Sequence, residues 1–476
     1  MKSKALLSND EIIKQKEYMS LVRALCNGNT RRVYIKTFGC QQNEADSERL
    51  YGMAEEMGYV KTDSPELADM ILVNTCAVRE HAELKALSIT GGFKKYKEKK
   101  PWLILGICGC MVAQEHRKDD IRTKYPYIDF LLGATLIHRF PEILYSTLKN
   151  GGRSFWIDNE LSVIAEELPV KRDKDAASAW VSVMYGCNNF CTYCIVPYVR
   201  GRERSRAPEV ILGEVKTLIA DGVREITLLG QNVNSYGKDL GGEYDFSDLL
   251  RDICALDGEC VLHFMTSHPK DAGRKLIDTM AANPARNGKV GIACHLHLPL
   301  QAGNDRVLSA MNRHYDIERY MSLIDYAREK MPSIALTTDI IVGFPGETEE
   351  EFLDTLRALE RVRYDNIFSF IYSRRKGTPA AAMEEQIPDD VKQDRFRRLL
   401  DLQTEISRSK NTELVGQALR VLVEGVSKTD STRLTGRSEQ NKLVHFEGDV
   451  SLTGSYVTVK ILSAEAHSLY GSLIRE

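Results

Sequence analysis

Three cysteines lie close together near the middle of the chain. They are Cys187, Cys191 and Cys194, with the spacing C-x3-C-x2-C. Three thiolates at this spacing can bind three irons of a cubane and leave the fourth iron open to another ligand. A closed zinc site needs four ligands, and no fourth cysteine or histidine lies nearby in the sequence. An iron–sulfur cluster with one open iron is therefore favoured over a zinc site or a chance group of buried thiols.

A second set of three cysteines is spread over the first part of the chain. These are Cys40, Cys76 and Cys110, and each comes at or just past the end of a strand-like run. Because the carboxyl ends of parallel strands meet at one edge of a sheet, we expect the three thiols to converge. Cys108 competes for the third position, but it lies inside a strand run, where a small buried thiol is ordinary. Position favours Cys110, which suggests a second cluster with one open iron.

The composition limits the class of protein. The chain has 476 residues, 43% hydrophobic and 28% charged, which is typical of a soluble protein with about three domains. A net charge of -3 excludes a globally basic nucleic-acid binder but not a local basic groove. The eleven cysteines suit metal binding and core packing better than disulfides. The N-terminus does not read as a secretory signal, and no apolar run could span a membrane, so we expect a cytoplasmic protein.

Alternating strand and helix patterns predict the elements that position the cysteines. Residues 31–150 predict an open parallel α/β sheet, with strands at 33–38, 70–75, 102–107 and 128–132 and helices at 44–57, 80–97 and 137–148. Residues 174–411 predict a partial (β/α)6 barrel, with strands at 180–184, 225–229, 261–266, 295–300, 334–342 and 367–372. In such a barrel the functional groups lie at the carboxyl ends of the strands.

The remaining segments complete the predicted domain organisation. Residues 1–30 form a helical extension, with a helix at 9–25, and the charged residues 151–173 form a linker. Residues 412–476 predict a small β-barrel with strands at 418–426, 443–446 and 455–462. A loop-rich stretch of this tail carries Arg433, Arg437, Asn441 and Lys442, which could contact RNA or form an ordinary solvated loop.

With these regions placed, the chain resembles the methylthiotransferases of the radical S-adenosylmethionine (SAM) superfamily from about Arg31 to its end. The resemblance rests on the segments 37–48, 74–79 and 109–111 and on the central cysteines, and the tail looks like a TRAM domain, an RNA-binding module. Segments 39–44 and 231–236 are most similar to the branch that modifies isopentenyladenosine at position 37 of tRNA. Gln42 departs from that branch, which commonly has Met there. Sister branches that act on threonylcarbamoyladenosine or on a ribosomal-protein aspartate stay open.

The resemblance implies two 4Fe–4S clusters and SAM as cofactors. The cluster of Cys187, Cys191 and Cys194 would cleave SAM to a radical, and the N-terminal cluster would supply sulfur to carbon 2 of the adenine. It also assigns Cys110, not Cys108, as the third N-terminal ligand. No side-chain acid or base is expected to be catalytic, because carbon 2 carries an unactivated C–H bond. The implied partners are the tRNA anticodon stem-loop, an electron donor and a sulfur or iron–sulfur assembly donor; a monomer without membrane contact is expected.

Further residues are expected around SAM and RNA. Tyr193 would flank the SAM adenine or simply pack beside the cluster, and residues 230–232 would approach the SAM amino group. Arg200, Glu203 and Arg206 could bind SAM, the arginines could instead hold tRNA phosphates, or the run could be merely solvated. The candidate SAM contacts are Tyr193, Gly230, Gln231, Asn232 and Arg206. The candidate RNA contacts are Arg374, Arg375, Arg437, Asn441 and Lys442. Four histidines on or beside strands, His263, His268, His295 and His297, are expected to be satisfied barrel residues.

Two hypotheses from other functional classes stay open. One is a two-cluster electron carrier, which would leave the barrel, the glycine-rich loops and the tail without a role. The other is an RNA-binding module whose N-terminal cysteines take zinc. Iron and acid-labile sulfide analysis after anaerobic purification separates the zinc module from the enzyme, and SAM cleavage separates the carrier.

Overall fold

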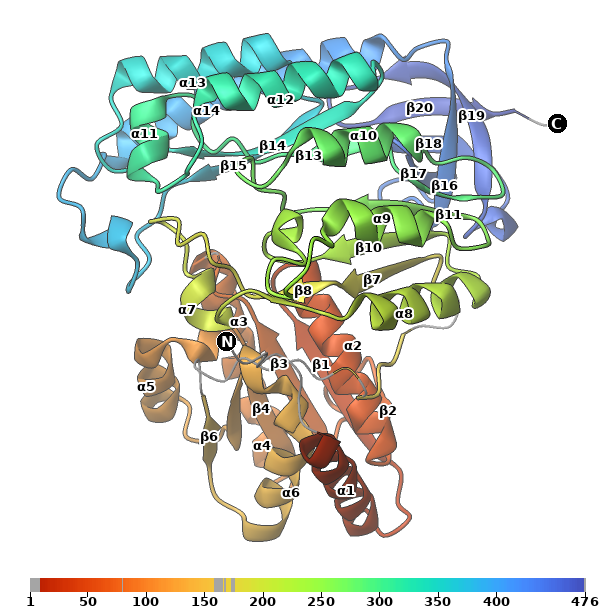
Figure 1. Ribbon diagram of the computed structural model, residues 1–476. Coiled ribbons are helices and arrows are strands. Elements are labelled where there is room, and N and C mark those ends of the chain that lie inside the picture. The colour runs from red at the N-terminus through yellow and green to blue at the C-terminus, as the bar shows by residue number, and fades with distance from the viewer. Residues whose placement is uncertain (1–8, 79, 158–165, 167, 173–175, 475–476) are drawn as a thin grey trace. The chain divides into compact units, whose positions relative to one another are not determined.

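The computed structural model describes residues 9–78, 80–157, 166, 168–172 and 176–474 (Figure 1). The chain separates into two compact units. The N-terminal unit comprises residues 1–173, 182–190 and 194–206, and the C-terminal unit comprises residues 174–181, 191–193 and 207–476. The predicted boundary near residue 174 lies outside the described residues, as do residues 158–165, 167 and 173 of the predicted linker 151–173.

The N-terminal unit contains the predicted open sheet. Its strands lie in the order β2-β1-β3-β4-β5-β6, and all their pairings are parallel. They are β1 (Arg31–Thr37), β2 (Tyr59–Lys61), β3 (Met70–Thr75), β4 (Ile104–Gly109), β5 (Phe130–Gly133) and β6 (Ser154–Trp156). The sequence missed β2 and β6, because three residues are too few to show a periodic pattern. β6 falls within the predicted linker, so the sheet continues beyond residue 150.

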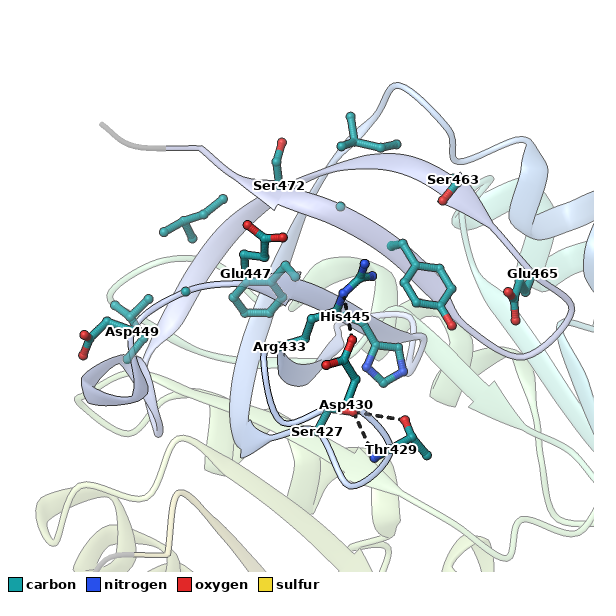
Figure 2. Close-up of a pocket in the computed structure, with 17 residues that line it drawn as sticks. Ser427, Thr429, Asp430, Arg433, His445, Glu447, Asp449, Ser463, Glu465 and Ser472 are labelled. Carbon is teal, nitrogen blue, oxygen red and sulfur yellow. Dashed lines mark hydrogen bonds and ion pairs between the residues drawn. The ribbon is translucent and has the colours of Figure 1, made fainter.

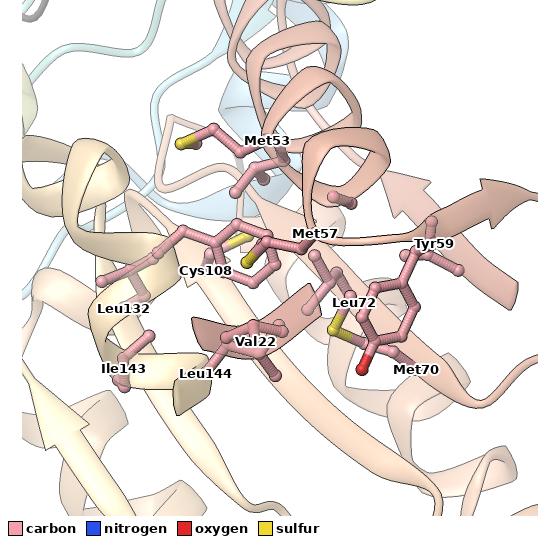
Figure 3. Packing of buried hydrophobic residues seen from close by; sticks show 14 of the residues in the cluster. Val22, Met53, Met57, Tyr59, Met70, Leu72, Cys108, Leu132, Ile143 and Leu144 are labelled. Atoms are coloured by element: carbon pink, nitrogen blue, oxygen red, sulfur yellow. The ribbon is translucent and has the colours of Figure 1, made fainter. Parts of the chain in front are cut away.

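Helices cover both faces of this sheet. They are α1 (Asn9–Leu25), α2 (Gln41–Glu56), α3 (Glu80–Gly92), α4 (Lys94–Lys99), α5 (Glu115–Lys124) and α6 (Phe140–Asn150), with short 3-10 turns η1 (Met111–Ala113) and η2 (Ala134–Arg139). Successive strand residues point to opposite faces, so Leu72 joins the core cluster of Figure 3, while Ile71 and Val73 join a second cluster. The helix predicted over 80–97 is broken at Phe93, whose ring is buried in the second cluster.

The C-terminal unit begins with the predicted barrel strands and helices. The strands form two sheets, one of β7 (Ser178–Ser182), β10 (Glu225–Leu229), β11 (Cys260–Phe264) and β12 (Val290–Ile292) and one of β13 (His295–His297), β14 (Ala335–Val342) and β15 (Asn366–Ile371). The helices are α8 (Pro208–Ala220), α9 (Phe246–Cys254), α10 (Arg274–Ala282), α11 (Asp305–Ala310), α12 (Ile317–Lys330), α13 (Glu349–Val362) and α14 (Asp389–Thr412). The sequence missed the short elements β12 and α11. The fold class expected from the sequence is confirmed.

A hairpin carries the segment around the central cysteines. The predicted strand 180–184 ends at Ser182, and β8 (Met184–Tyr185) then pairs with β9 (Arg204–Ser205) in an antiparallel two-stranded sheet. The short helix α7 (Val196–Arg200) lies between β8 and β9. The loop from Gly186 to Ile195, which contains the three central cysteines, is therefore followed by α7 and a return strand.

The tail forms the predicted closed barrel. Its strands are β16 (Ala418–Val426), β17 (Leu434–Ser438), β18 (Leu443–Glu447), β19 (Tyr456–Ala464) and β20 (Leu469–Leu473), with a 3-10 turn η5 (Val450–Leu452). The sequence missed β20, and it treated β17 as part of a loop. Gly436 at the middle of β17 obscures the strand pattern, and the position requires glycine because an added Cβ would lie 2.2 Å from the Leu422 carbonyl oxygen.

A buried ion pair ties this small barrel to the larger one. The Lys442 ammonium contacts an oxygen of Asp365 and the Asn411 side-chain oxygen, each at 2.8 Å. Although burial opposes ionisation, Lys442 and Lys410 hold the pKa of Asp365 below its usual range. Lys442 is only 9% exposed. A carboxylate distant in the sequence therefore takes up the charge of Lys442, which leaves little of this side chain for the expected RNA contact.

Replacing Lys442 with methionine tests this attachment. We expect the Lys442→Met variant to lose about 3 kcal/mol of stability in the small barrel, because Asp365 keeps its buried charge with only Lys410 to balance it. Hydrogen exchange of the β18 amides measures this loss. Lys460→Met, at an exposed position of β19, is the control and should change exchange little. Equal losses in both variants would contradict the structural role of Lys442.

Candidate functional site

The N-terminal thiols come together at the carboxyl edge of the sheet. Cys40 is the N-cap of α2, just past β1, and Cys76 directly follows β3. Cys110 follows β4, and its backbone N–H donates to the Thr75 carbonyl at 2.9 Å. Gly39 packs so closely on Cys76 that an added Cβ would lie 2.7 Å from the Cys76 Cβ. The fold thus brings together three thiols that the sequence separates by tens of residues.

Hydrogen bonds hold the loops that carry these thiols. The side chains of Asn43 and Asn74, both fully buried, bond to each other and to backbone: Asn43 donates to the Thr75 carbonyl at 3.0 Å, and Asn74 donates to the Asn43 carbonyl at 2.8 Å. They join the Cys40 loop to the Cys76 strand. Sequence reasoning quoted both residues as parts of motifs but gave neither a role. Gln42, the departure from the family branch, donates to the Ser182 hydroxyl at 2.9 Å and to an Asp46 carboxylate oxygen at 3.4 Å.

Arg200 is the cation beside this thiol group. It is 5% exposed, its Nε donates to the Cys110 Sγ at 3.1 Å, and its Nη2 lies 2.8 Å from an Asp46 carboxylate oxygen. Although burial favours the neutral guanidine, Cys110 and Asp46 hold the pKa of Arg200 well above its ordinary value. Burial raises the pKa of the Cys110 thiol to about 12. Arg200 is therefore a partner of the Cys110 thiol and of Asp46 in this structure, and it is buried rather than part of a solvated arginine run.

Cys108 occupies a different environment from Cys110. It is 1% exposed, and Figure 3 shows it in the apolar core, on the strand interior. Its Sγ lies 3.7 Å from the Val73 carbonyl oxygen. Gly109 then turns the chain at φ +99°, where an added Cβ would lie 2.4 Å from the Thr75 carbonyl oxygen. The structure thus supports the choice of Cys110 over Cys108 as a candidate ligand.

The central cysteines lie in the loop after β8. In the C-terminal unit, Arg313 Nη1 donates to the Cys191 Sγ at 3.3 Å, and Nη2 donates to the Pro299 carbonyl at 3.2 Å. Arg313 is also buried, and Cys191 and Tyr315 help to hold its pKa well above the ordinary value against the effect of burial. Within the N-terminal unit, the Cys187 N–H donates to the Gly201 carbonyl at 3.1 Å. Each cysteine set thus has one ligand candidate that accepts a hydrogen bond from a buried arginine.

Among the residues expected around SAM, Tyr193, Gly230, Gln231 and Asn232 have surroundings that fit a SAM contact. Tyr193 packs against an apolar cluster that includes Phe344 and Tyr372. Asn232 is 1% exposed, and its Nδ2 donates to Asp271 at 2.7 Å, while its Oδ1 has no partner within the described part of the chain. This unsatisfied acceptor fits the ammonium group of SAM. Gly230 and Gln231 precede it in the same loop after β10.

Arg206, the fifth residue expected around SAM, has a different environment. Its side chain is 3% exposed and lies 2.7 Å from a Glu166 carboxylate oxygen, and it donates to the Ser182 carbonyl at 2.6 Å. An internal carboxylate thus pairs with this guanidinium in the structure, and contact between Arg206 and the SAM carboxylate stays a prediction. Sequence reasoning could not separate Arg206 from its neighbours in the arginine run.

The residues expected to contact RNA also differ in exposure. Arg374 is exposed and Arg375 is buried. Arg437 bonds to the Asn441 side-chain oxygen at 3.2 Å and lies 3.1 Å from a Glu424 oxygen, with 41% of its side chain exposed. Arg374, Arg437 and Asn441 thus have surface that RNA could reach, in contrast to Lys442.

A cavity of about 1260 Å³ lies on the small barrel (Figure 2). The His445 and Tyr470 rings stack at 5.3 Å along its wall, and Arg433 lies over the Tyr470 ring. Its lining also contains four carboxylates, of Asp430, Glu447, Asp449 and Glu465. These carboxylates disfavour phosphate, so we do not assign the RNA backbone to this cavity.

Two of the four barrel histidines have hydrogen-bond partners, whereas His263 Nε2 has no hydrogen bond in the described structure and lies 3.3 Å from a Glu225 carboxylate oxygen. His295 and His297 both bond to the Thr337 hydroxyl, at 2.9 and 3.0 Å, and burial lowers the pKa of His295 to about 3. His268 differs, because its Nε2 is buried without a partner in the described structure.

Donor chemistry and position support the two cysteine sets as cluster sites. Cysteine thiolates are the usual ligands of iron–sulfur clusters, and each set lies at or beside the end of a strand. Neither set, nor any other group of three or more His, Cys, Asp or Glu side chains among the described residues, is arranged to hold a metal ion in this structure, so the assignment of clusters to the two sets rests on donor type and position. No described helix is long and apolar enough to cross a membrane.

Comparisons with known proteins agree with this division of the chain. Residues 32–133 match the uncharacterized protein family UPF0004, residues 181–359 match the radical SAM superfamily, and residues 412–474 match the TRAM domain. The tRNA-2-methylthio-N(6)-dimethylallyladenosine synthase of Thermoanaerobacter sp. (strain X514) is 48% identical over 475 residues, which cover 100% of this chain and 99% of that protein. The synthase of the same name from Clostridium perfringens (strain 13 / Type A) is 49% identical over 440 residues, covering 92% of this chain and 97% of that protein.

A solved structure shares the fold at much lower identity. The radical SAM methyltransferase TsrM from Kitasatospora setae has a TM-score of 0.54 at 14% sequence identity. The match covers 74% of this chain and 75% of that one. It supports the radical SAM architecture and carries no information about the substrate.

Proposed function

The chain belongs to the family of tRNA-2-methylthio-N(6)-dimethylallyladenosine synthases, and we propose from this membership that it catalyses the reaction for which these relatives are named. It is a radical SAM methylthiotransferase that adds a methylthio group to carbon 2 of N(6)-isopentenyladenosine at position 37 of tRNA. SAM serves both as methyl donor and as radical source. The observation that carries this proposal is 48% identity over the full length of both chains.

SAM and a 4Fe–4S cluster follow from the radical SAM family. We assign this cluster to Cys187, Cys191 and Cys194, and we propose a second 4Fe–4S cluster on Cys40, Cys76 and Cys110. When bound, the first supplies the electron that cleaves SAM and the second supplies the transferred sulfur. The site residues fit these groups, because each set provides three thiols and leaves one iron without a protein ligand.

The chain's own residues neutralise charge and orient ligands. Arg313 donates to the Cys191 sulfur and Arg200 to the Cys110 sulfur, so each buried guanidinium stabilises a thiolate in a low-dielectric site. Tyr193 offers a ring for the SAM adenine, and Asn232 offers its free carbonyl oxygen to the SAM ammonium. Residues 230 and 231 approach the same group through their backbone.

The substrate must reach both cysteine sets as an unstacked base. Adenosine in the anticodon loop can be splayed out of the stack, and single-stranded bases are the usual targets of specific RNA recognition. We propose that the TRAM barrel and the segment after β15 hold the anticodon stem-loop through Arg374, Arg437 and Asn441, and we leave out Arg375 because it is buried. Lys442 is left out because its ammonium is buried against Asp365.

The other partners, the cellular location and the domain boundaries are also proposals. We propose that the reaction uses an electron donor and a sulfur or iron–sulfur assembly donor, and that the enzyme acts on tRNA in the cytoplasm as a monomer. We divide the chain into an N-terminal extension to residue 30, an auxiliary-cluster domain from residue 31 through β6, a linker from there to residue 173, a radical SAM core over 174–411 and a TRAM domain over 412–476.

Nucleoside mass spectrometry tests the proposed reaction. Reconstituted protein is incubated anaerobically with SAM, a strong reductant and tRNA that bears isopentenyladenosine. We expect a nucleoside heavier by one methylthio group, and no such product without SAM. SAM cleavage with an unchanged nucleoside would contradict the substrate, and tRNA with threonylcarbamoyladenosine would then be tested for the sister activity.

A further inference from the structure

Unsatisfied polar atoms gather where β10 and β11 end in the radical SAM core. Ser267 and His268 are each 3% exposed, yet the Ser267 hydroxyl and the His268 Nε2 have no partner in the part of the chain that the structure describes. Asn234 is 8% exposed, and neither atom of its amide group has a partner there. Buried polar atoms are almost always hydrogen-bonded in folded proteins. A group of exceptions at a barrel's functional edge indicates a ligand.

The two loops that carry these residues are joined. β10 and β11 pair in parallel, so both loops leave the same edge of the sheet. The Thr266 hydroxyl donates to the Gly230 carbonyl at 2.6 Å and connects the loops directly. Thr266 has φ +63°, a strained conformation for a β-branched residue of the kind found at binding and catalytic sites. It directly precedes Ser267 and His268.

The tautomer of His268 follows from its backbone contact. The Lys270 N–H donates to the His268 Nδ1 at 3.2 Å, so Nδ1 is an acceptor without a proton. Burial, together with Arg313 and nearby lysines, lowers the pKa of His268 far below its ordinary value. The ring is therefore neutral, and its proton is on Nε2. His268 thus presents one unused N–H donor, and the Asn234 amide presents both donors and an acceptor.

A short chain of contacts connects His268 to the central cysteines. The His268 ring meets the Tyr315 ring edge-to-face at 5.6 Å, and the Tyr315 hydroxyl accepts from Arg313 Nε at 3.1 Å. Arg313 also donates to the Cys191 sulfur. The unused donor therefore lies on the side of the core where the radical is generated.

We infer that His268 and Asn234 bind the base edge of the target adenosine. His268 Nε2–H donates to a ring nitrogen next to carbon 2, and the Asn234 amide pairs with the N6–H and another ring nitrogen, as asparagine does with adenine elsewhere. His268 offers a donor and Asn234 offers donors and an acceptor, which matches the acceptors and the donor of an adenine edge; the SAM ammonium has only donors and is assigned to the Asn232 oxygen. The SAM adenine is assigned instead to Tyr193, against the cluster of Phe344 and Tyr372. The inference rests on the proposed function.

Base discrimination by the intact holoenzyme tests this assignment. Binding is measured for anticodon stem-loops with isopentenyladenosine or an abasic nucleotide at position 37, and SAM affinity is measured in parallel. In His268→Ala and Asn234→Asp, we expect the preference for the base-bearing stem-loop to fall about 10-fold. SAM affinity and SAM cleavage without RNA should change less than about twofold.

Conservative variants separate recognition from folding. His268→Gln places an amide N–H near the position of Nε2–H and should recover most of the lost preference, which a purely structural role would not predict. Asn234→Asp serves as the test variant if His268→Ala does not fold. Weaker SAM binding with unchanged base discrimination would overturn the inference and place these residues in the cofactor site.

The same assay distinguishes failure of the inference from failure of the proposed function. If wild-type enzyme forms the methylthio product and the variants keep their full base discrimination, only the assignment of His268 and Asn234 is wrong. If wild-type enzyme forms no product from isopentenyladenosine RNA, the proposed function is wrong, and the inference falls with it.

Discussion

Cys191→Ala should abolish SAM cleavage, whereas Cys76→Ala should leave cleavage intact and stop formation of the methylthio nucleoside. Cys191 belongs to the set that leaves an iron open for SAM, and losing one of three thiolates removes the cluster that supplies the electron. Cys76 belongs to the set assigned to sulfur supply, at the edge of a separate sheet. Chromatography of 5′-deoxyadenosine measures cleavage, and nucleoside mass spectrometry measures transfer.

Cys108→Ala is the matched control for the N-terminal set. Cys108 lies two residues before Cys110 but faces the apolar core, so the variant should retain iron, cleavage and transfer, with only a modest loss of stability from the small cavity. Loss of SAM cleavage in both Cys191→Ala and Cys76→Ala would contradict independent clusters. Loss of iron in Cys108→Ala would contradict the choice of Cys110.

Arg200→Met should destabilise the N-terminal unit by about 3–5 kcal/mol, because it leaves the Asp46 carboxylate buried without its cation. The guanidinium lies 2.8 Å from that carboxylate, and both side chains are 6% exposed. The variant also removes the N–H donor to the Cys110 sulfur, so iron bound by the N-terminal set should fall as well. Urea denaturation measures the first effect, and iron analysis with SAM-cleavage assays measures the second.

Two further variants separate the causes of these effects. Arg202→Met, at an exposed position of the same arginine run, should change neither stability nor iron content. The double variant Arg200→Met with Asp46→Leu should recover much of the lost stability, because replacing both members of a buried ion pair by apolar groups is often close to neutral. Its iron content should stay low, because Cys110 still lacks the donor. Full iron content in Arg200→Met would show that the arginine does not support the cluster.

The positions of the cysteines could be interpreted from the sequence alone. A ligand triplet within eight residues is a local feature, so its spacing is readable without a fold. The sequence also predicted the second set of ligands, Cys40, Cys76 and Cys110. Strand periodicity places each of them at or past the end of a strand, and the carboxyl ends of parallel strands lie at one edge of a sheet. The same periodicity predicted the open sheet, the partial barrel and the closed tail barrel, and it failed for three-residue strands such as β2, β6 and β12.

The charged residues required the tertiary structure. Arg200 and Arg206 look alike in one arginine run, yet one pairs with Asp46 beside a thiol and the other with Glu166. Lys442 looked like a surface cation and pairs with Asp365, far away in the sequence. The partner of a charge is set by long-range packing, which local spacing does not encode. The unsatisfied donor of His268 is of the same kind, because only the folded chain shows which of its two nitrogens already has a partner.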